Sequence, residues 1–98
     1  MTRQVSLLVN GDPIPLDYFV QAFIDHTTGA MIESLEDTAP IKNLTLSIDG
    51  GKVVITLNGM TVRINAFVTK IMKSTVTGMI SVLKGVKEAE RVQINIAR

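Results

Sequence analysis

The sequence contains two similar halves that align with each other without a gap. Residues 53–96 lie over residues 5–48, and over these 44 positions ten residues are identical and seventeen pairs are apolar in both halves. The segment VSLLVNGDPIPLDYFV, for example, lies over VVITLNGMTVRINAFV. Because a shared apolar pattern means a shared buried face, we predict that both halves fold alike and that residues 1–98 form one domain of two repeats.

Each half reads as strand, turn, short strand, helix and strand. Apolar and polar residues alternate before Asn10-Gly11 and Asn58-Gly59, and Asn-Gly favours the positive φ angles of a two-residue hairpin turn. The side chains of Asp17 and Asn65 are suited to cap a following helix. The predicted returning arms are residues 14–16 and 60–64, and the first should be short and at a sheet edge, because Pro13 and Pro15 cannot donate hydrogen bonds to a strand. The predicted helices are residues 18–36 and 66–84, and the predicted closing strands are residues 44–48 and 92–96.

The two halves meet at Asp49-Gly50-Gly51, which predicts a tight hairpin rather than a linker. We therefore expect an α+β two-layer sandwich: an internally duplicated ββαβ unit with two helices on one face of a mainly antiparallel sheet. The strand order stays open. Twelve apolar residues are predicted to be buried: Phe19, Phe23, Met31, Leu35, Phe67, Ile71, Met79 and Leu83 on the helices, and Leu44, Leu46, Val92 and Ile94 on the sheet.

Composition excludes several kinds of chemistry. The absence of cysteine removes disulfides and thiolate nucleophiles, and it fits a cytoplasmic setting. No run of apolar residues approaches the roughly 18 that a membrane span needs. Gly51-Lys52 lacks the glycine and hydroxyl residue of a phosphate-binding loop, and the acidic residues show no paired catalytic arrangement. We expect no enzyme activity, no metal and no cofactor.

Charge distinguishes the halves. Residues 1–48 hold six acidic and two basic residues, a net −4, whereas residues 49–98 hold eight basic and three acidic residues, a net +5. On the predicted polar helix faces, acidic residues of one half lie over basic residues of the other, as Asp25 over Lys73 and Glu36 over Lys84. These faces could pair within the molecule, bind a charged partner or a second copy, or only solvate the surface. The candidate interaction residues are Asp25, His26, Glu33, Glu36, Lys70, Lys73 and Lys84, together with Arg63 and Arg91 on the predicted solvent face of the sheet.

A few single residues have two interpretations. Tyr18 could anchor a partner or lie on the surface without a role. Ala30 and Gly78, at matched positions, favour close helix packing but could also leave room for a ligand. Arg63 and Arg91 could contact phosphates, yet the four aromatic residues are too few and too apolar in setting for base stacking. Nucleic acid is therefore the least favoured partner.

The segments NGDPIPLDYFV and TTGAMIESL, with NGMTVRINAFV and TVTGMISVLKGVKEAERVQI, are similar to a group of small uncharacterised prokaryotic proteins. Their pattern is roughly NG-x-x-IPLN-x-FV, then GMV-x-SLKG, then a closing strand. The resemblance implies the fold only, because its motifs are turns, caps and core positions. The leading hypothesis is a non-catalytic interaction or scaffold module that could self-associate; the alternative is a small-molecule-binding regulatory domain using a groove between the helices.

Overall fold

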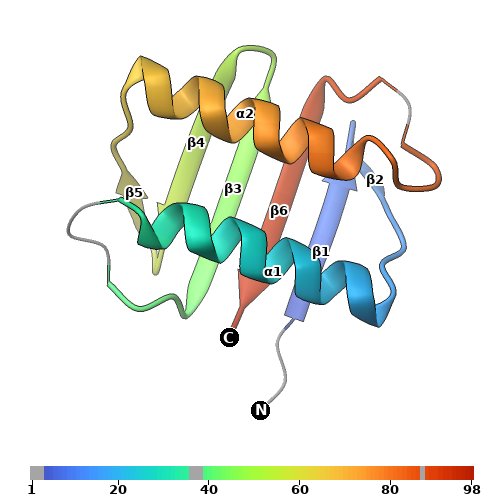
Figure 1. Cartoon of the computed structure of the whole chain (residues 1–98), viewed down its shortest axis with the longest axis horizontal. Coiled ribbons are helices and arrows are strands. Elements are labelled where there is room, and N and C mark those ends of the chain that lie inside the picture. Colours follow the sequence, from blue (N-terminus) through green and yellow to red (C-terminus); the bar gives the residue numbers. More distant parts are fainter. Residues whose placement is uncertain (1–3, 36–38, 87) are drawn as a thin grey trace.

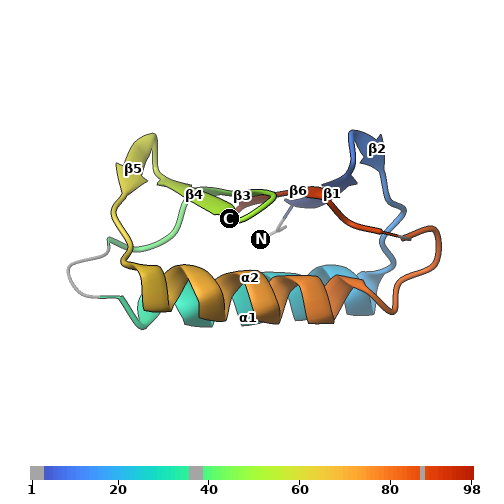
Figure 2. The ribbon, with the colours of Figure 1, turned by 90° about the horizontal axis from the view of Figure 1, so that it is seen from above.

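The computed structural model describes residues 4–35, 39–86 and 88–98, which form two layers. One layer is a six-stranded sheet, and both helices cover the same face of it (Figure 1). Seen along its edge, the sheet carries the helices on one side, while the β2 and β5 hairpin arms rise on the other (Figure 2). The elements are β1 (Gln4–Val9), β2 (Asp12–Pro13), α1 (Tyr18–Glu33), β3 (Asn43–Asp49), β4 (Lys52–Leu57), β5 (Met60–Val62), α2 (Ala66–Ile80) and β6 (Arg91–Ala97).

The sheet interleaves the two halves of the chain. Its order is β2-β1-β6-β3-β4-β5, and every neighbouring pair is antiparallel. The first strand of each half therefore pairs with the last strand of the other half. In the central β3–β6 pair, Leu46 lies opposite Ile94, which is its counterpart in the alignment of the two halves. The α+β fold with two helices on one sheet face is as predicted, whereas an origin by internal duplication stays a prediction.

Both Asn-Gly turns have the predicted backbone conformation. Asn10 and Asn58 each have a φ of +51°, and the following glycines each have a φ of +86°, as a two-residue hairpin turn of this type requires. The predicted Asp49-Gly50-Gly51 hairpin joins β3 to β4. The first returning arm, β2, is short and lies at the sheet edge, as predicted from Pro13 and Pro15, which cannot donate hydrogen bonds to a strand. The bounds of both arms differ from the prediction, because β2 is Asp12–Pro13 and β5 ends at Val62.

Both helices begin where the sequence predicts and end earlier. Asp17 and Asn65 cap their N-termini. The side chain of each accepts a hydrogen bond at 2.8 Å from the backbone N–H of the residue three positions later. The helices end at Glu33 and Ile80, short of the predicted residues 36 and 84, and Ser34 and Ser81 are their C-terminal capping residues. Each serine hydroxyl donates to a carbonyl of the preceding turn, at 2.8 and 2.9 Å. Serine hydroxyls that bond the backbone in this way compete with helix continuation.

The core fills the space between the sheet and the helices. The sheet residues that were predicted to belong to the core are buried. The methionines and leucines predicted on the helices are partly buried and pack against the core. Four predicted core residues are wrong: Phe19, Phe23, Phe67 and Ile71 are 72, 49, 69 and 45% exposed. Each helix has apolar residues on two sides, and only one side faces the sheet. That side is occupied instead by Ile24, Ile32, Met72, Val76 and Ile80.

Candidate interaction surface

The solvent side of the helix layer carries an apolar stripe. Phe19 and Phe23 are one helical turn apart on α1, and Phe67 and Ile71 occupy the matching positions on α2. Seven residues beyond Phe23 and Ile71, the same side of each helix carries a small residue. We call this surface the outer helix face and define it by six exposed residues: Phe19, Phe23, Ala30, Phe67, Ile71 and Gly78.

Helical geometry explains why these side chains point away from the core. Phe67 and Val76 are nine residues apart, which is two and a half turns, so they lie on opposite sides of α2. Val76 is fully buried against the sheet, and Phe67 therefore faces solvent. The rings of Phe19 and Phe23 stack on each other, with centroids 6.1 Å apart and planes inclined by 13°. The two rings therefore form one aromatic cluster at the start of α1.

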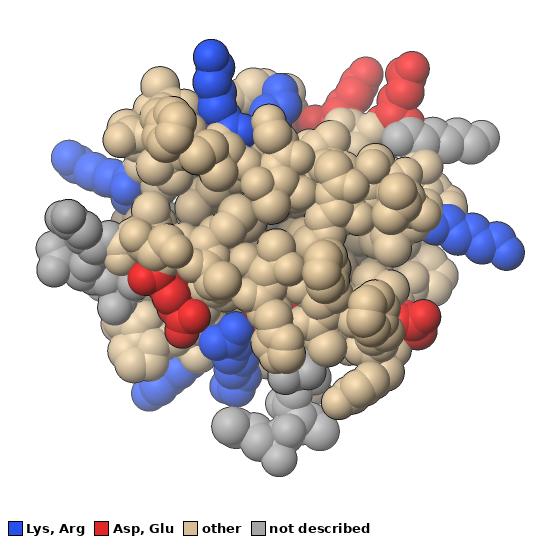
Figure 3. All heavy atoms as spheres, in the orientation of Figure 1, with Lys and Arg blue, Asp and Glu red and all other residues tan. Residues whose placement is uncertain are grey.

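Charged side chains lie around the outer helix face rather than on it. In Figure 3 most of the surface over the two helices is uncharged, and the blue and red atoms lie mainly towards its margins. Glu33 ends α1, and Lys70 lies in the second turn of α2. An apolar centre with a charged margin is the usual composition of a protein–protein interface.

The candidate charged residues on the helices divide into three groups. His26, Glu33, Lys70 and Lys84 are exposed, and Lys73 is partly exposed, so all five are accessible near the outer helix face. Glu36 lies outside the described residues. The prediction that Asp25 lies on the solvent side of its helix is wrong, because this residue is only 2% exposed.

The buried Asp25 forms an ion pair with Arg98. The Nε of Arg98 donates to Oδ1 of Asp25 at 2.9 Å, and Nη2 donates to the Asp25 carbonyl oxygen at 3.2 Å. The guanidinium lies against Gly29, where an added Cβ would collide with it. The arrangement attaches the residue that follows β6 to α1, which makes Asp25 a structural residue and not a surface contact.

The helices do not meet closely at their predicted small residues. Ala30 and Gly78 are exposed, and a Cβ added at Gly78 would have no described atom of the other helix within 4 Å. The prediction of close packing at this position is therefore wrong. Tyr18, at the start of α1, is exposed like the neighbouring phenylalanine, which is compatible with either of its two interpretations.

A groove lies between the start of α1 and the segment that follows α2. Its volume is about 750 Å³, and most of its wall is apolar, with Asp17 and Lys84 as its charged residues. The remaining lining residues are Pro15, Leu16, Val20, Val82, Leu83 and Gly85. This is a candidate ligand groove at one end of the helix layer.

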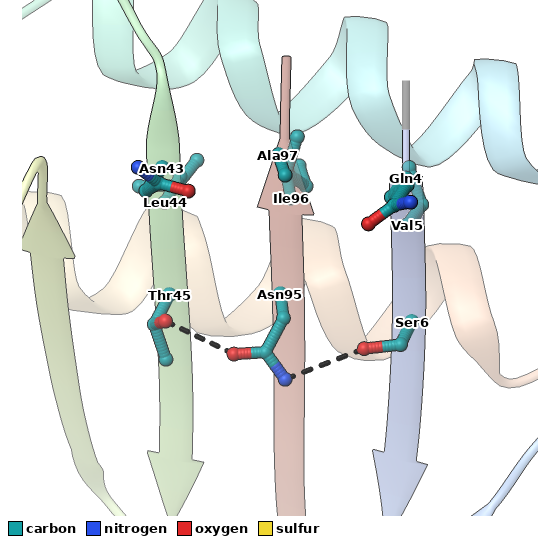
Figure 4. A pocket seen from close by; sticks show the side chains of 9 residues that line it. All are labelled: Gln4, Val5, Ser6, Asn43, Leu44, Thr45, Asn95, Ile96 and Ala97. Atoms are coloured by element: carbon teal, nitrogen blue, oxygen red, sulfur yellow. Dashed lines mark hydrogen bonds between the residues drawn. The ribbon is translucent and has the colours of Figure 1, made fainter. Parts of the chain in front are cut away.

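The opposite face of the sheet is polar. Asn95 on the central strand β6 accepts from Thr45 Oγ1 at 3.0 Å and donates to Ser6 Oγ at 3.4 Å, so one ladder of side chains crosses three strands (Figure 4). Two shallow pockets lie on this face, of about 290 and 220 Å³. The polar groups of this ladder therefore bond to one another.

The two arginines predicted on this face are not neighbours. Arg91 begins β6, whereas Arg63 follows β5, and two strands of the sheet separate those elements. The exposed aromatic rings lie over the helices, on the other side of the molecule. The sheet therefore lacks the combination of stacked aromatics and clustered cations that binds single-stranded nucleic acid.

Within the described residues, no cluster of histidine, aspartate or glutamate could hold a metal ion, and no helix is long and apolar enough to cross a membrane. Comparison with known proteins gave no match to a family model, a curated protein or a solved structure. The resemblance of the repeat motifs to small prokaryotic proteins therefore stays a prediction.

The charged residues at the margin of the outer helix face were predicted from the sequence. The exposed phenylalanines at its centre were predicted to be in the core. One signal could have found them. The stripe through Phe19 and Phe23 lies opposite the one through Ile24, Thr28 and Ile32, so the helix has more apolar surface than one sheet can cover.

Proposed function

We propose that this protein is a non-catalytic interaction module whose outer helix face binds another protein. The observation that supports the proposal is the exposure of three phenylalanine side chains on one uncharged surface. A single exposed apolar residue is ordinary, but a contiguous group with charges at its margin is typical of a binding surface. Aromatic residues supply much of the binding energy at such surfaces.

The proposal predicts that the outer helix face is covered in the cell. Hydroxyl-radical footprinting, performed inside host cells and on the dilute purified protein, measures the oxidation of individual side chains. We expect Phe23 and Phe67 to be oxidised less in cells than in the dilute protein. Met60 is the matched control, because it is exposed on β5 and lies outside the helices. Equal oxidation of the phenylalanines in both settings would remove the basis of the proposal.

The groove beside Asp17 and Lys84 favours a second candidate function, the binding of a small apolar molecule. Its volume of about 750 Å³ falls in the range of known ligand sites, and its wall is largely apolar. Native mass spectrometry of protein isolated from its own host would detect a retained ligand. A Leu16→Glu substitution should abolish that extra mass if the groove holds it. The cytoplasmic setting and the absence of enzyme activity stay predictions.

A further inference from the structure

The outer helix face is large enough to form the centre of a stable dimer. A fully buried aromatic side chain hides roughly 150–250 Å², so at their observed exposure the three phenylalanines offer about 300–450 Å². A standard interface takes about 800 Å² from each partner. The phenylalanines alone would supply up to about half of that area, with the exposed side chains of Ile71, Tyr18 and Val82 beside them.

Bulky and small residues alternate across this surface in a way that suits a second copy. The bulky side chains Phe19, Phe23, Phe67 and Ile71 lie in the first half of each helix, and the small residues Ala30 and Gly78 lie in the second half. The helices run in opposite directions, so the start of one lies beside the end of the other (Figure 1). If the helices of a second copy pack antiparallel on α1 and α2, each pair of bulky side chains lies against a small residue of the other copy.

Charge selects the axis of such a dimer. The end of α1, with Glu33, and the start of α2, with Lys70, lie at the same side of the molecule (Figure 1). A two-fold axis parallel to the helices places α1 of one copy on α2 of the other and keeps these ends together. Glu33 then lies over the Lys70 region of the second copy, which is a favourable pairing of charges.

The other face-to-face axis is unfavourable. A two-fold axis that lies in the interface and crosses the helices at right angles stacks each helix on its own copy. It would bring Lys70 and Lys73 near Lys84 of the second copy, and Glu33 near Asp17. Both contacts join like charges, which costs free energy in an interface.

We propose that the partner of the outer helix face is a second copy of this chain, with α1 of each copy packed antiparallel on α2 of the other. The inference rests on the proposed function, since it names the protein that the surface binds. The contact is isologous, so every interaction occurs twice. The dimer contains four layers, sheet–helix–helix–sheet, with the phenylalanines buried at its centre and the polar sheet faces outside.

Sedimentation velocity on the full chain, from micromolar to submillimolar concentration, tests this proposal. We expect a concentration-dependent dimer for the wild type. Phe67→Ser should weaken dimerisation at least about a hundredfold, because two buried aromatic anchors are lost. Met60→Ser removes an exposed apolar side chain outside the helices and should leave the dimer unchanged. Circular dichroism and thermal melting of both variants would verify that each remains folded.

A charge exchange tests the arrangement of the helices. Glu33→Lys should weaken the dimer about tenfold, because it places like charges together at two equivalent contacts. Lys70→Glu should do the same. The double variant Glu33→Lys/Lys70→Glu restores opposite charges across the proposed interface, and its dimer should approach wild-type affinity. High salt should reduce the effects of both single substitutions.

Three results would overturn the proposal. A wild type that stays monomeric throughout, or a dimer that Phe67→Ser leaves intact, would show that the outer helix face does not bind a second copy. A dimer that needs Phe67 but is not restored by the charge exchange would contradict the packing of α1 on α2. The footprinting experiment separates these failures from failure of the proposed function, because a different protein partner would still protect the phenylalanines in cells.

Discussion

At the scale of single residues, the pair Asp25 and Arg98 shows how one contact fixes several choices in the sequence. The carboxylate of Asp25 is buried, Arg98 donates to it at 2.9 Å, and Gly29 leaves room for the guanidinium. In the other half, the positions aligned with Asp25 and Gly29 are Lys73 and Thr77. The ion pair that attaches α1 to the residue after β6 therefore cannot form at the aligned positions of α2.

Removing Arg98 should destabilise the fold. Arg98→Ala leaves the buried Asp25 carboxylate without this partner, and the expected loss is about 1.5–3 kcal/mol, the range for hydrogen bonds to charged groups. It falls short of the largest losses for buried pairs because Arg98 itself is partly exposed. Urea denaturation measures the change. The control Arg63→Ala removes an exposed arginine and should change stability by less than about 0.5 kcal/mol. Equal effects would refute this interpretation.

Thr28 offers a stabilising substitution. It is fully buried, and its hydroxyl has no hydrogen-bond partner among the described residues. The aligned residue in α2 is Val76, which has nearly the same shape and no hydroxyl. Thr28→Val should therefore raise the free energy of unfolding by about 1 kcal/mol, since an unsatisfied buried polar group is removed. Thr69→Val is the control and should lower stability, because that hydroxyl donates to Asn65. A destabilised Thr28→Val variant would indicate that its hydroxyl has a partner.

At the scale of elements, each Asn-Gly turn binds the segment that leads into a neighbouring strand. The Oδ1 of Asn58 accepts from the backbone N–H groups of Lys42 and Asn43, both at 2.9 Å, and its Nδ2 donates to the Pro40 carbonyl. Asn10 makes the same three kinds of contact with the segment before β6. One asparagine therefore sets a hairpin turn and also fixes the start of the strand beside that hairpin.

The two roles of this asparagine can be separated. Asn58→Gly keeps the positive φ angle and loses all three side-chain hydrogen bonds, so we expect a loss of about 1–3 kcal/mol in denaturation experiments. Asn58→Asp keeps the acceptor and loses only the donor to Pro40, and its loss should be smaller. If the glycine variant were as stable as the wild type, the turn conformation alone would account for the asparagine.

The features that were predictable at this scale are those that neighbouring residues determine. Asn10 and Gly11 specify their turn, and Asp17 specifies the start of a helix, whatever the rest of the chain does. Phe67 was not predictable in this way. It and Val76 are both apolar, and only the position of the sheet decides which is buried. Asp25 was missed for the same reason, because its partner is 73 residues away in the sequence.

At the scale of the whole molecule, the two-layer architecture explains why the outer helix face is exposed. The molecule measures 36 × 34 × 18 Å, so two layers account for its whole depth. Among the described residues, no segment forms a third layer over the helices. The apolar side chains on the outer helix face are therefore exposed in this structure. The strand order was not predictable, because it depends on pairing between distant parts of the chain.

The interleaved sheet leads to a test of the chain as a whole. Strand β3 pairs only with β4 and β6, and both belong to the second half of the chain. Strand β6 likewise pairs with β1 and β3, both from the first half. A chain divided between Gly50 and Gly51 therefore gives two fragments that each lack the pairing of their third strand. Each fragment alone should be largely unfolded, because a single hairpin with one helix is marginal in water.

Mixed in equal amounts, the fragments should assemble into a native-like complex, since the division falls in a surface turn and removes no strand pairing. Circular dichroism and two-dimensional NMR of each fragment and of the mixture would measure this. The melting temperature of the complex should rise with concentration, because folding has become an association. A fragment that alone gave a native spectrum and a cooperative melt would show that one half holds its own core, and that the cross-pairing of strands is not what unites the fold.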